Sequence, residues 1–237
     1  MTRLFPKHAV DQLREDSQAK AMRPFLARGS NAKRCACCLM AKFACFCDHR
    51  QAQNSALQFI LLYHRDEIHK PTNSGRLIAD LFPNQTQAFM WSRTEPEPAL
   101  LNLLDERKES CTILFPNTET AQQQERTVRN QLELVRTEEK TDKPHTFVIL
   151  DGTWKQASKM FHQSEWLKHI PHFEINQAAQ RSFLVRHSKH DMQFATAEVT
   201  AMLLDSLGYT QQSENLLSYY QAFNQACLNS RKRGNEQ

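Results

Sequence analysis

With 237 residues, of which 40% are hydrophobic, the chain is long enough to bury one substantial core and a small appendage. Its longest clear apolar run, residues 59–63, is much shorter than the ~20 residues that span a bilayer, and charges stand at the amino terminus in place of a signal sequence. We therefore expect a soluble, cytoplasmic protein without a membrane partner. Its five glycines form neither a G-x-G-x-x-G nor a Walker motif, which excludes the common Gly-rich phosphate loops.

The net charge of +4 is distributed unevenly along the chain. Residues 1–50 contain ten Lys or Arg against four Asp or Glu, a net charge of +6, which leaves −2 for the rest of the chain. A helix is predicted over residues 8–27, bent or interrupted at Pro24. From Ser17 to Cys47 there is no acidic residue. The basic residues of this region are candidates for binding a nucleic-acid backbone: Lys20, Arg23, Arg28, Lys33, Arg34 and Lys42. The alternative is a solvated basic surface without a partner.

Five of the seven cysteines fall within thirteen residues, at positions 35, 37, 38, 45 and 47. In a cytosolic chain, paired thiols at this spacing are typical of structural zinc sites. We expect Zn²⁺ to be bound by Cys35, Cys38, Cys45 and Cys47, because a C-x-x-C turn lets both sulfurs converge. Cys37 is then left over, and His49 is an alternative ligand. The sequence therefore predicts a basic helix and a zinc module over residues 1–50, followed by a second domain over residues 51–237.

The second domain alternates apolar runs with helical patterns. Strands are predicted at residues 57–63, 86–91, 111–115, 146–151, 173–175 and 183–186, and helices at 72–82, 97–106, 119–136, 154–161, 195–207 and 213–228, with a short helix around Trp166 and a basic tail at 231–233. Such alternation indicates an α/β fold with a mostly parallel sheet and helices on both faces.

The turn between the strand that ends at Asp151 and the following helix is the expected place for chemistry. Ligands of α/β proteins bind outside the carboxyl ends of the strands, and this turn carries a carboxylate, Gly152 and the aromatic Trp154. The alternative is structural: Asp151 or Thr153 caps the helix, and Trp154 fills the core.

Two further helix starts carry candidate ligands. Gly75 also follows a strand and precedes a helix, with Thr72 or Ser74 as the expected cap and Arg76 in the first turn, where a carboxylate or phosphate could bind. Farther along, Thr196 is the expected cap of a helix whose positive end would favour Glu198.

Four motifs in order resemble the DTW-domain family, in particular its bacterial tRNA-uridine aminocarboxypropyltransferases. They are the cysteine array, Thr72-Asn-Ser-Gly-Arg-Leu77, Asp151-Gly-Thr-Trp154 and Thr196-Ala-Glu198, and the resemblance extends from about residue 23 to residue 207. Ala195 and Val199 depart from the Ser-Thr-x-Glu-Ala form of the last motif, so a role for a hydroxyl at position 195 is not implied.

The resemblance implies a knotted, SPOUT-like fold and a defined reaction. In that reaction the 3-amino-3-carboxypropyl group of S-adenosylmethionine is transferred to N3 of a tRNA uridine, with release of methylthioadenosine. Asp151 is then either the general base for N3–H or a ligand of the donor. The donor is expected at the turn from Leu150 to Lys155, with contacts to Gly75, Arg76, Leu150, Gly152, Thr153, Trp154, Arg186, Thr196 and Glu198.

Two other functions fit parts of the pattern. A SPOUT-type methyltransferase would use the same donor and RNA but release S-adenosylhomocysteine. A noncatalytic zinc-bearing RNA-binding protein would bind tRNA without consuming the donor. No obligate protein partner is implied.

Overall fold

The computed structural model describes residues 5–21, 33–115, 127–129, 143–175 and 194–232 of the chain. Six strands form one sheet in the order β2-β1-β5-β3-β6-β4, and every pairing in it is parallel. The strands are β1 (Gln58–Tyr63), β2 (Thr86–Met90), β3 (Cys111–Leu114), β4 (Val128–Arg129), β5 (Thr146–Asp151) and β6 (His172–Phe173). The α-helices are α1 (Ala9–Lys20), α2 (Arg76–Leu81), α3 (Pro98–Glu106), α6 (Trp154–Gln163), α8 (Thr196–Ser206) and α9 (Thr210–Lys232). This confirms the predicted α/β class with a parallel sheet.

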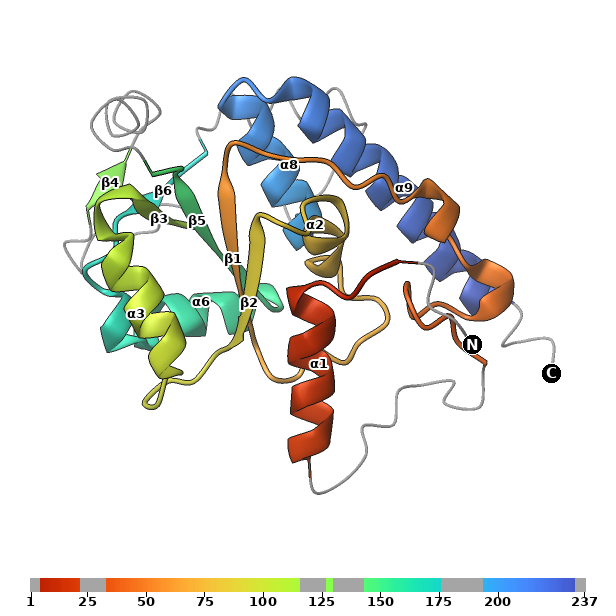
Figure 1. Ribbon diagram of the computed structural model, residues 1–237, viewed down its shortest axis with the longest axis horizontal. Helices are drawn as coiled ribbons and strands as arrows, with labels where there is room; N and C mark the ends of the chain where they lie inside the picture. The colour runs from red at the N-terminus through yellow and green to blue at the C-terminus, as the bar shows by residue number, and fades with distance from the viewer. Residues whose placement is uncertain (1–4, 22–32, 116–126, 130–142, 176–193, 233–237) are drawn as a thin grey trace.

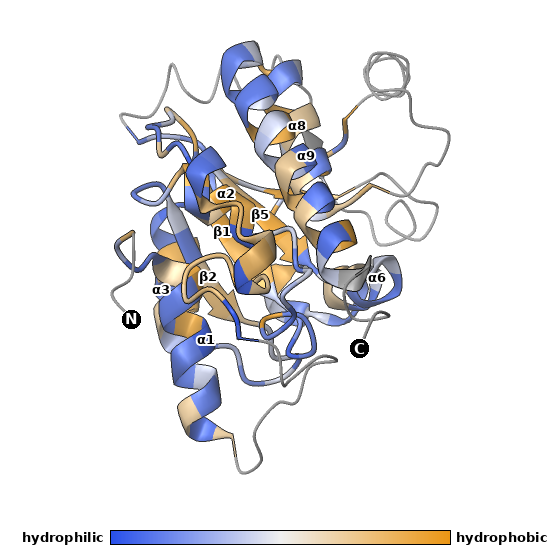
Figure 2. Ribbon diagram, turned by 90° about the vertical axis from the view of Figure 1, so that its right-hand side faces the viewer, coloured by the Kyte–Doolittle hydropathy of each residue, from blue (hydrophilic) through white to orange (hydrophobic). Residues whose placement is uncertain are grey.

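Helices cover both faces of the sheet (Figure 1). Side chains alternate along β1: Phe59 and Leu61 pack with α2, α8 and α9, whereas Ile60 and Leu62 pack with α3 and α6. Strands buried on both faces read as continuous apolar runs, which is why β1 and β5 were recognisable in the sequence. Figure 2 shows these hydrophobic strands enclosed between helices whose outer surfaces are hydrophilic.

The two central strands diverge in their onward connections. From β1 the chain passes through α2 to β2 on one side, and from β5 it passes through α6 to β6 on the other side. Tyr63 and Asp151, the last residues of β1 and β5, are register partners. The carboxyl ends of two such strands form a topological switch point, the usual ligand site of open α/β sheets.

The cysteine-rich segment packs against the main domain. Phe46 lies 5.3 Å from Tyr219 and 5.8 Å from Phe223 of α9, measured between ring centroids. Cys37, Cys38, Met40 and Phe46 belong to the same hydrophobic cluster as the sheet residues of that face. The boundary expected near residue 50 stays a prediction.

A buried carboxylate joins four parts of the chain. Asp80 of α2 is 1% exposed and accepts from Tyr219 O–H at 3.2 Å. The Nη1 atom of Arg50 lies 3.0 Å from Asp80, and Nε2 of His8 lies 3.1 Å from it. Desolvation would raise the pKa of Asp80, but the positive charge of Arg76, the hydrogen bond to His8 and the charge of Arg50 outweigh it and hold the pKa at about 2.

The first predicted helix is shorter and less basic than expected. It ends at Lys20, where Ala21 takes an extended conformation with ψ 127°. Its charged residues are Asp11, Arg14, Glu15, Asp16 and Lys20, so α1 carries a net charge of −1. The expectation that this helix is basic is therefore wrong for α1 as the structure describes it, because its first turns are acidic. Arg23 and Arg28 lie outside the described residues.

Two other expectations differ at their boundaries, and a third is not tested. The helix predicted over 119–136 is wrong at Val128–Arg129, which instead pair with His172 and Phe173 as the edge strand β4. Thr127 and Val128 are β-branched residues that favour a strand, and pairing to a neighbouring strand decides the conformation here. The strand predicted at 183–186 lies outside the described residues, and α9 continues through Lys232 into the expected basic tail.

The described helices include none that is both long and apolar enough to cross a membrane. A SPOUT-like knot stays a prediction.

Candidate functional site

Asp151 ends β5 inside the protein, with 1% of its surface exposed. Its backbone carbonyl accepts from the N–H of His64, the residue that follows β1, at 2.9 Å. The carboxylate therefore lies at the carboxyl end of its strand, as the sequence predicted, and the strand order places this end at the switch point between β1 and β5.

The carboxylate of Asp151 is bound by the loop before α2. Asn73 Nδ2 donates to Asp151 Oδ1 at 2.5 Å. The other end of the same amide, Asn73 Oδ1, accepts from the backbone N–H of Arg76 at 3.2 Å and from the Tyr63 hydroxyl at 3.5 Å. The N-cap of α2 is Gly75, which makes no side-chain capping bond, so the expectation that Thr72 or Ser74 caps this helix was wrong. The side chain of Asn73 accepts from the first turn of α2 instead.

The side chain of Asp151 lies so close to position 75 that only glycine fits there. A Cβ atom at position 75 would lie 1.8 Å from Asp151 Oδ2 and 3.2 Å from the Tyr63 hydroxyl oxygen. Any larger residue would displace the carboxylate or the start of α2. Oδ2 itself has no hydrogen-bond partner of ordinary geometry among the described residues.

This environment makes Asp151 an unusually basic carboxylate. Burial, the largest cause, raises the pKa of Asp151 to about 7 from its ordinary 3.8. The hydrogen bond from Asn73 and the nearby Thr196 hydroxyl lower this pKa, whereas the negative charge of Glu67 raises it. Asp151 can therefore accept or hold a proton near neutral pH.

A cavity of about 660 Å³ lies at the ends of β3, β5 and β6, and it is lined by the residues on either side of Asp151 but not by Asp151 itself. The predicted donor ligands Leu150, Gly152, Thr153, Trp154 and Thr196 all line it. Other lining residues were not predicted from the sequence, among them Phe115, Phe194 and Met202. Phe115 directly follows an apolar strand, which was the available signal. A mostly apolar cavity with a few polar groups is typical of a small-molecule site.

Thr153 has the structural role of a helix cap, whereas Trp154 does not have the structural role of a core residue. Thr153 caps α6, because its hydroxyl accepts from Gln156 N–H while the Gln156 side chain accepts from Thr153 N–H. Trp154 does not fill the core: 59% of it is exposed, and its ring stacks on Phe115 with centroids 5.8 Å apart and planes 7° from parallel. The indole thus forms one wall of the cavity.

Three predicted donor ligands, Gly75, Arg76 and Glu198, do not line the cavity. Arg76 is 2% exposed, donates to the Cys37 carbonyl and lies 3.6 Å from Asp80. Glu198 is 3% exposed and accepts from the N–H of Ala195 at 2.9 Å. Ala195 is the N-cap of α8 and Thr196 its first residue, so the expectation that Thr196 caps this helix was wrong. Arg186 lies outside the described residues.

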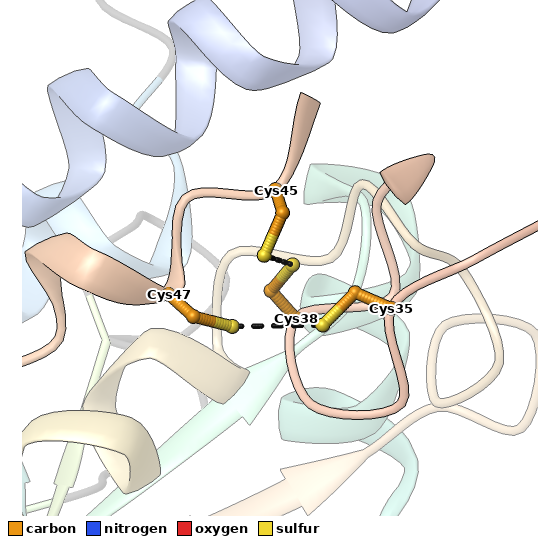
Figure 3. A group of neighbouring side chains, drawn as sticks. All are labelled: Cys35, Cys38, Cys45 and Cys47. Atoms are coloured by element: carbon orange, nitrogen blue, oxygen red, sulfur yellow. Dashed lines mark hydrogen bonds between the residues drawn. The ribbon is translucent and has the colours of Figure 1, made fainter. Parts of the chain in front are cut away.

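The four cysteines chosen as metal ligands converge. The sulfurs of Cys35, Cys38, Cys45 and Cys47 all lie within 4.8 Å of one another (Figure 3). The Sγ–Sγ distance is 3.6 Å between Cys35 and Cys47 and 3.7 Å between Cys38 and Cys45. A tetrahedral Zn²⁺ with Zn–S bonds of about 2.3 Å separates its sulfurs by about 3.8 Å, so the four thiols fit this ion.

The remaining candidates at this segment have other positions. Cys37 is 2% exposed and outside the group of four, and its carbonyl accepts from Arg76. His49 is exposed and is not in that group either. The four cysteines that spacing selected are therefore the ones whose sulfurs converge.

The predicted RNA-binding residues that the structure describes divide into two kinds. Lys20, Lys33 and Lys42 are exposed. Arg34 is half-buried and donates to the carbonyl of Leu39 at 3.0 Å, which supports the turn between the first two ligands and the next pair. Leu39 has φ 63°, a conformation that needs such support in a residue other than glycine.

Comparison with known proteins places this geometry in a family. The family model described as DTW domain matches residues 32–228, which include the cysteine segment, the Asp151 turn and α8. The chain belongs to the DTW family. A curated protein of Macaca fascicularis, tRNA-uridine aminocarboxypropyltransferase 2, is 24% identical over 178 residues. The match covers 73% of this chain but 56% of the relative, so the chain spans about half the length of that protein. No solved structure matches the chain.

Proposed function

We propose that this DTW protein transfers the 3-amino-3-carboxypropyl group of S-adenosylmethionine to N3 of a uridine in tRNA. The observation that carries the proposal is Asp151, a buried carboxylate whose pKa is raised to about 7, beside a cavity that its own turn helps to line. The name of the macaque relative supports the same reaction.

The cavity suits the donor in size and chemistry. About 660 Å³ lies within the range of sites for small molecules, and its aromatic and aliphatic wall can enclose an adenosyl group. Trp154 presents an exposed ring face to which a sulfonium can bind by a cation–π contact. S-adenosylmethionine supplies an electrophilic carbon on a sulfonium, whose neutral thioether needs no protonation to leave.

Asp151 accounts for the proton that the reaction releases. Uridine N3 must lose its proton as it forms the new N–C bond, and Asp151 takes that proton in the role of general base. A carboxylate with a pKa of about 7 is a stronger base than an ordinary one and is still largely ionised just above neutral pH. Asn73 and Gly75 hold the carboxylate in place.

The orientation of the donor decides which product forms. Three carbons of a sulfonium are open to attack, so the cavity wall that orients the donor selects the aminocarboxypropyl carbon over the methyl carbon.

The cysteine segment contributes a metal and part of the tRNA surface. The four thiols hold Zn²⁺ as a structural ion, and the exposed Lys20, Lys33 and Lys42 contribute to tRNA binding.

Nucleoside mass spectrometry tests the proposal. We expect unmodified tRNA incubated with the protein and S-adenosylmethionine, labelled in its aminocarboxypropyl carbons, to yield labelled 3-(3-amino-3-carboxypropyl)uridine and methylthioadenosine. Replacing Asp151 with Ala should lower kcat/KM by roughly 10²–10⁴-fold, the usual contribution of a general base. The control is Asp105→Asn, which changes a side chain that is 82% exposed on α3.

Other products would identify the alternatives. S-adenosylhomocysteine with a methylated nucleoside would indicate a methyltransferase, and tRNA binding without consumption of the donor would indicate a noncatalytic protein. Undiminished transfer by the Asp151→Ala variant would remove Asp151 from the mechanism.

A further inference from the structure

Three exposed cationic side chains lie on α6, whose first turn lines the cavity, and on the loop after β1 that α6 contacts. Lys155 directly follows Trp154, Lys159 is one turn later on α6, and Arg65 lies in the loop after β1 with 84% of its side chain exposed. Gln156 Nε2 donates to Asp66 Oδ2 at 3.4 Å, which joins α6 to that loop. We call Arg65, Lys155 and Lys159 the α6 basic cluster.

The carboxylates around the α6 basic cluster do not cancel its positive charge. Burial lowers the pKa of His64 most, and the positive charges of Arg65 and Lys159 lower it further. Asp66 is the carboxylate that opposes them, and it lies 3.9 Å from Arg65. Glu67, the next carboxylate, lies 2.6 Å from Lys70. The cluster therefore keeps a net positive charge next to the site.

The two lysines do not stabilise α6. Lys155 lies in the first turn, where the helix dipole disfavours a cation, and Lys155 and Lys159 are like charges four residues apart. Neither is within ion-pair distance of a carboxylate in the part of the chain that the structure describes, whereas Lys70, Lys108 and Lys168 each pair with one. Two lysines at positions that are unfavourable for the helix, without a carboxylate partner among the described residues, indicate that an external anion binds there.

We propose that the α6 basic cluster binds the phosphodiester backbone of tRNA on either side of the target uridine. The inference rests on the proposed function and adds a second RNA surface to it. A base that enters the cavity past Trp154 leaves its own phosphates outside, where α6 and the loop after β1 present their cations. The cysteine segment then holds a more distant part of the same tRNA.

The double variant Lys155→Glu, Lys159→Glu tests this surface. We expect its Kd for tRNA to rise about tenfold and the slope of log K against log salt to fall by roughly 2, one unit for each lost phosphate contact. The affinity for S-adenosylmethionine should stay at the wild-type value, because neither lysine lines the cavity.

The matched control is Lys108→Glu, Lys143→Glu. It makes the same change in net charge at residues just before β3 and β5, the opposite end of the sheet. A tRNA Kd and salt slope equal to those of this control would overturn the proposal. The neutral variant Lys155→Gln, Lys159→Gln should show the same direction with a smaller loss, and wild-type binding by both variants would likewise contradict the proposal.

The two proposals fail in different experiments. If wild-type protein forms no aminocarboxypropyluridine but the glutamate variant loses tRNA affinity, the proposed function fails and this surface stands. If wild-type protein is active and the glutamate variant binds tRNA like its control, the surface fails and the proposed function stands.

Discussion

At the scale of single residues, Asp151 combines reactivity with a cost to stability. Its pKa is raised to about 7 in the folded protein, mainly by burial. The folded state therefore holds the Asp151 proton more tightly than the unfolded state does. Ionisation of Asp151 therefore destabilises the folded state. This destabilisation is absent below the ordinary pKa near 4, grows as the pH rises towards 7 and reaches its full value above pH 7.

We expect Asp151→Asn to stabilise the fold at pH 8 and to have little effect at pH 4. The amide never ionises, so it removes a penalty of up to about 4 kcal/mol that the wild type carries at high pH. Urea unfolding at the two pH values measures the difference. The exposed Asp105→Asn should show no such dependence. Equal gains at both pH values would contradict a raised pKa at Asp151.

At the scale of elements, the start of α2 controls the carboxylate at the end of β5. Asn73 links the two, because one end of its amide donates to Asp151 and the other accepts from the N–H of Arg76. The structure thus couples two motifs that lie 78 residues apart in the sequence.

Asn73→Ala should move the acidic limb of the kcat/KM profile to higher pH. The Asn73 hydrogen bond lowers the pKa of Asp151, so its loss raises that pKa further and leaves less of the base ionised at pH 7. Transfer should recover in part as the pH is raised. Ser74→Ala, a change at the next buried residue, is the control. A uniform loss of rate with an unmoved profile would show that Asn73 does not tune Asp151.

At the scale of the whole molecule, the cysteine segment and the sheet share one structure. Phe46 packs on α9, Arg50 reaches Asp80 of α2, and Cys37 accepts from Arg76. A structural metal at the four thiols would then stabilise more than its own turn.

We expect the purified protein to contain about one Zn²⁺ per chain, and a chelator to lower the Tm of the whole domain in a single transition. The shift should be several degrees, because binding energy that is lost at the thiols is lost from the shared core. Elemental analysis and thermal unfolding measure this. Cys38→Ser should behave like the chelated protein, and Cys227→Ser in α9 should keep its metal. A second, unshifted transition would show that the segment unfolds separately.

The local parts of this protein were determined by its sequence alone. Apolar runs buried on both faces identified the central strands β1 and β5, and close thiol spacing identified the four convergent cysteines. Asp151 and Trp154 were identified as site candidates because they lie at the predicted end of a strand. Each of these depends on residues that are near one another in the chain.

Only the tertiary structure decided which distant residues meet. It placed Asn73 and Gly75 against Asp151, left Arg76 and Glu198 outside the cavity lining, and joined the loop after β1 to α6 through Asp66 and Gln156. It also made Val128–Arg129 an edge strand instead of part of a helix. Long-range pairing and burial depend on strand order and on helix placement, which local propensity and spacing do not encode.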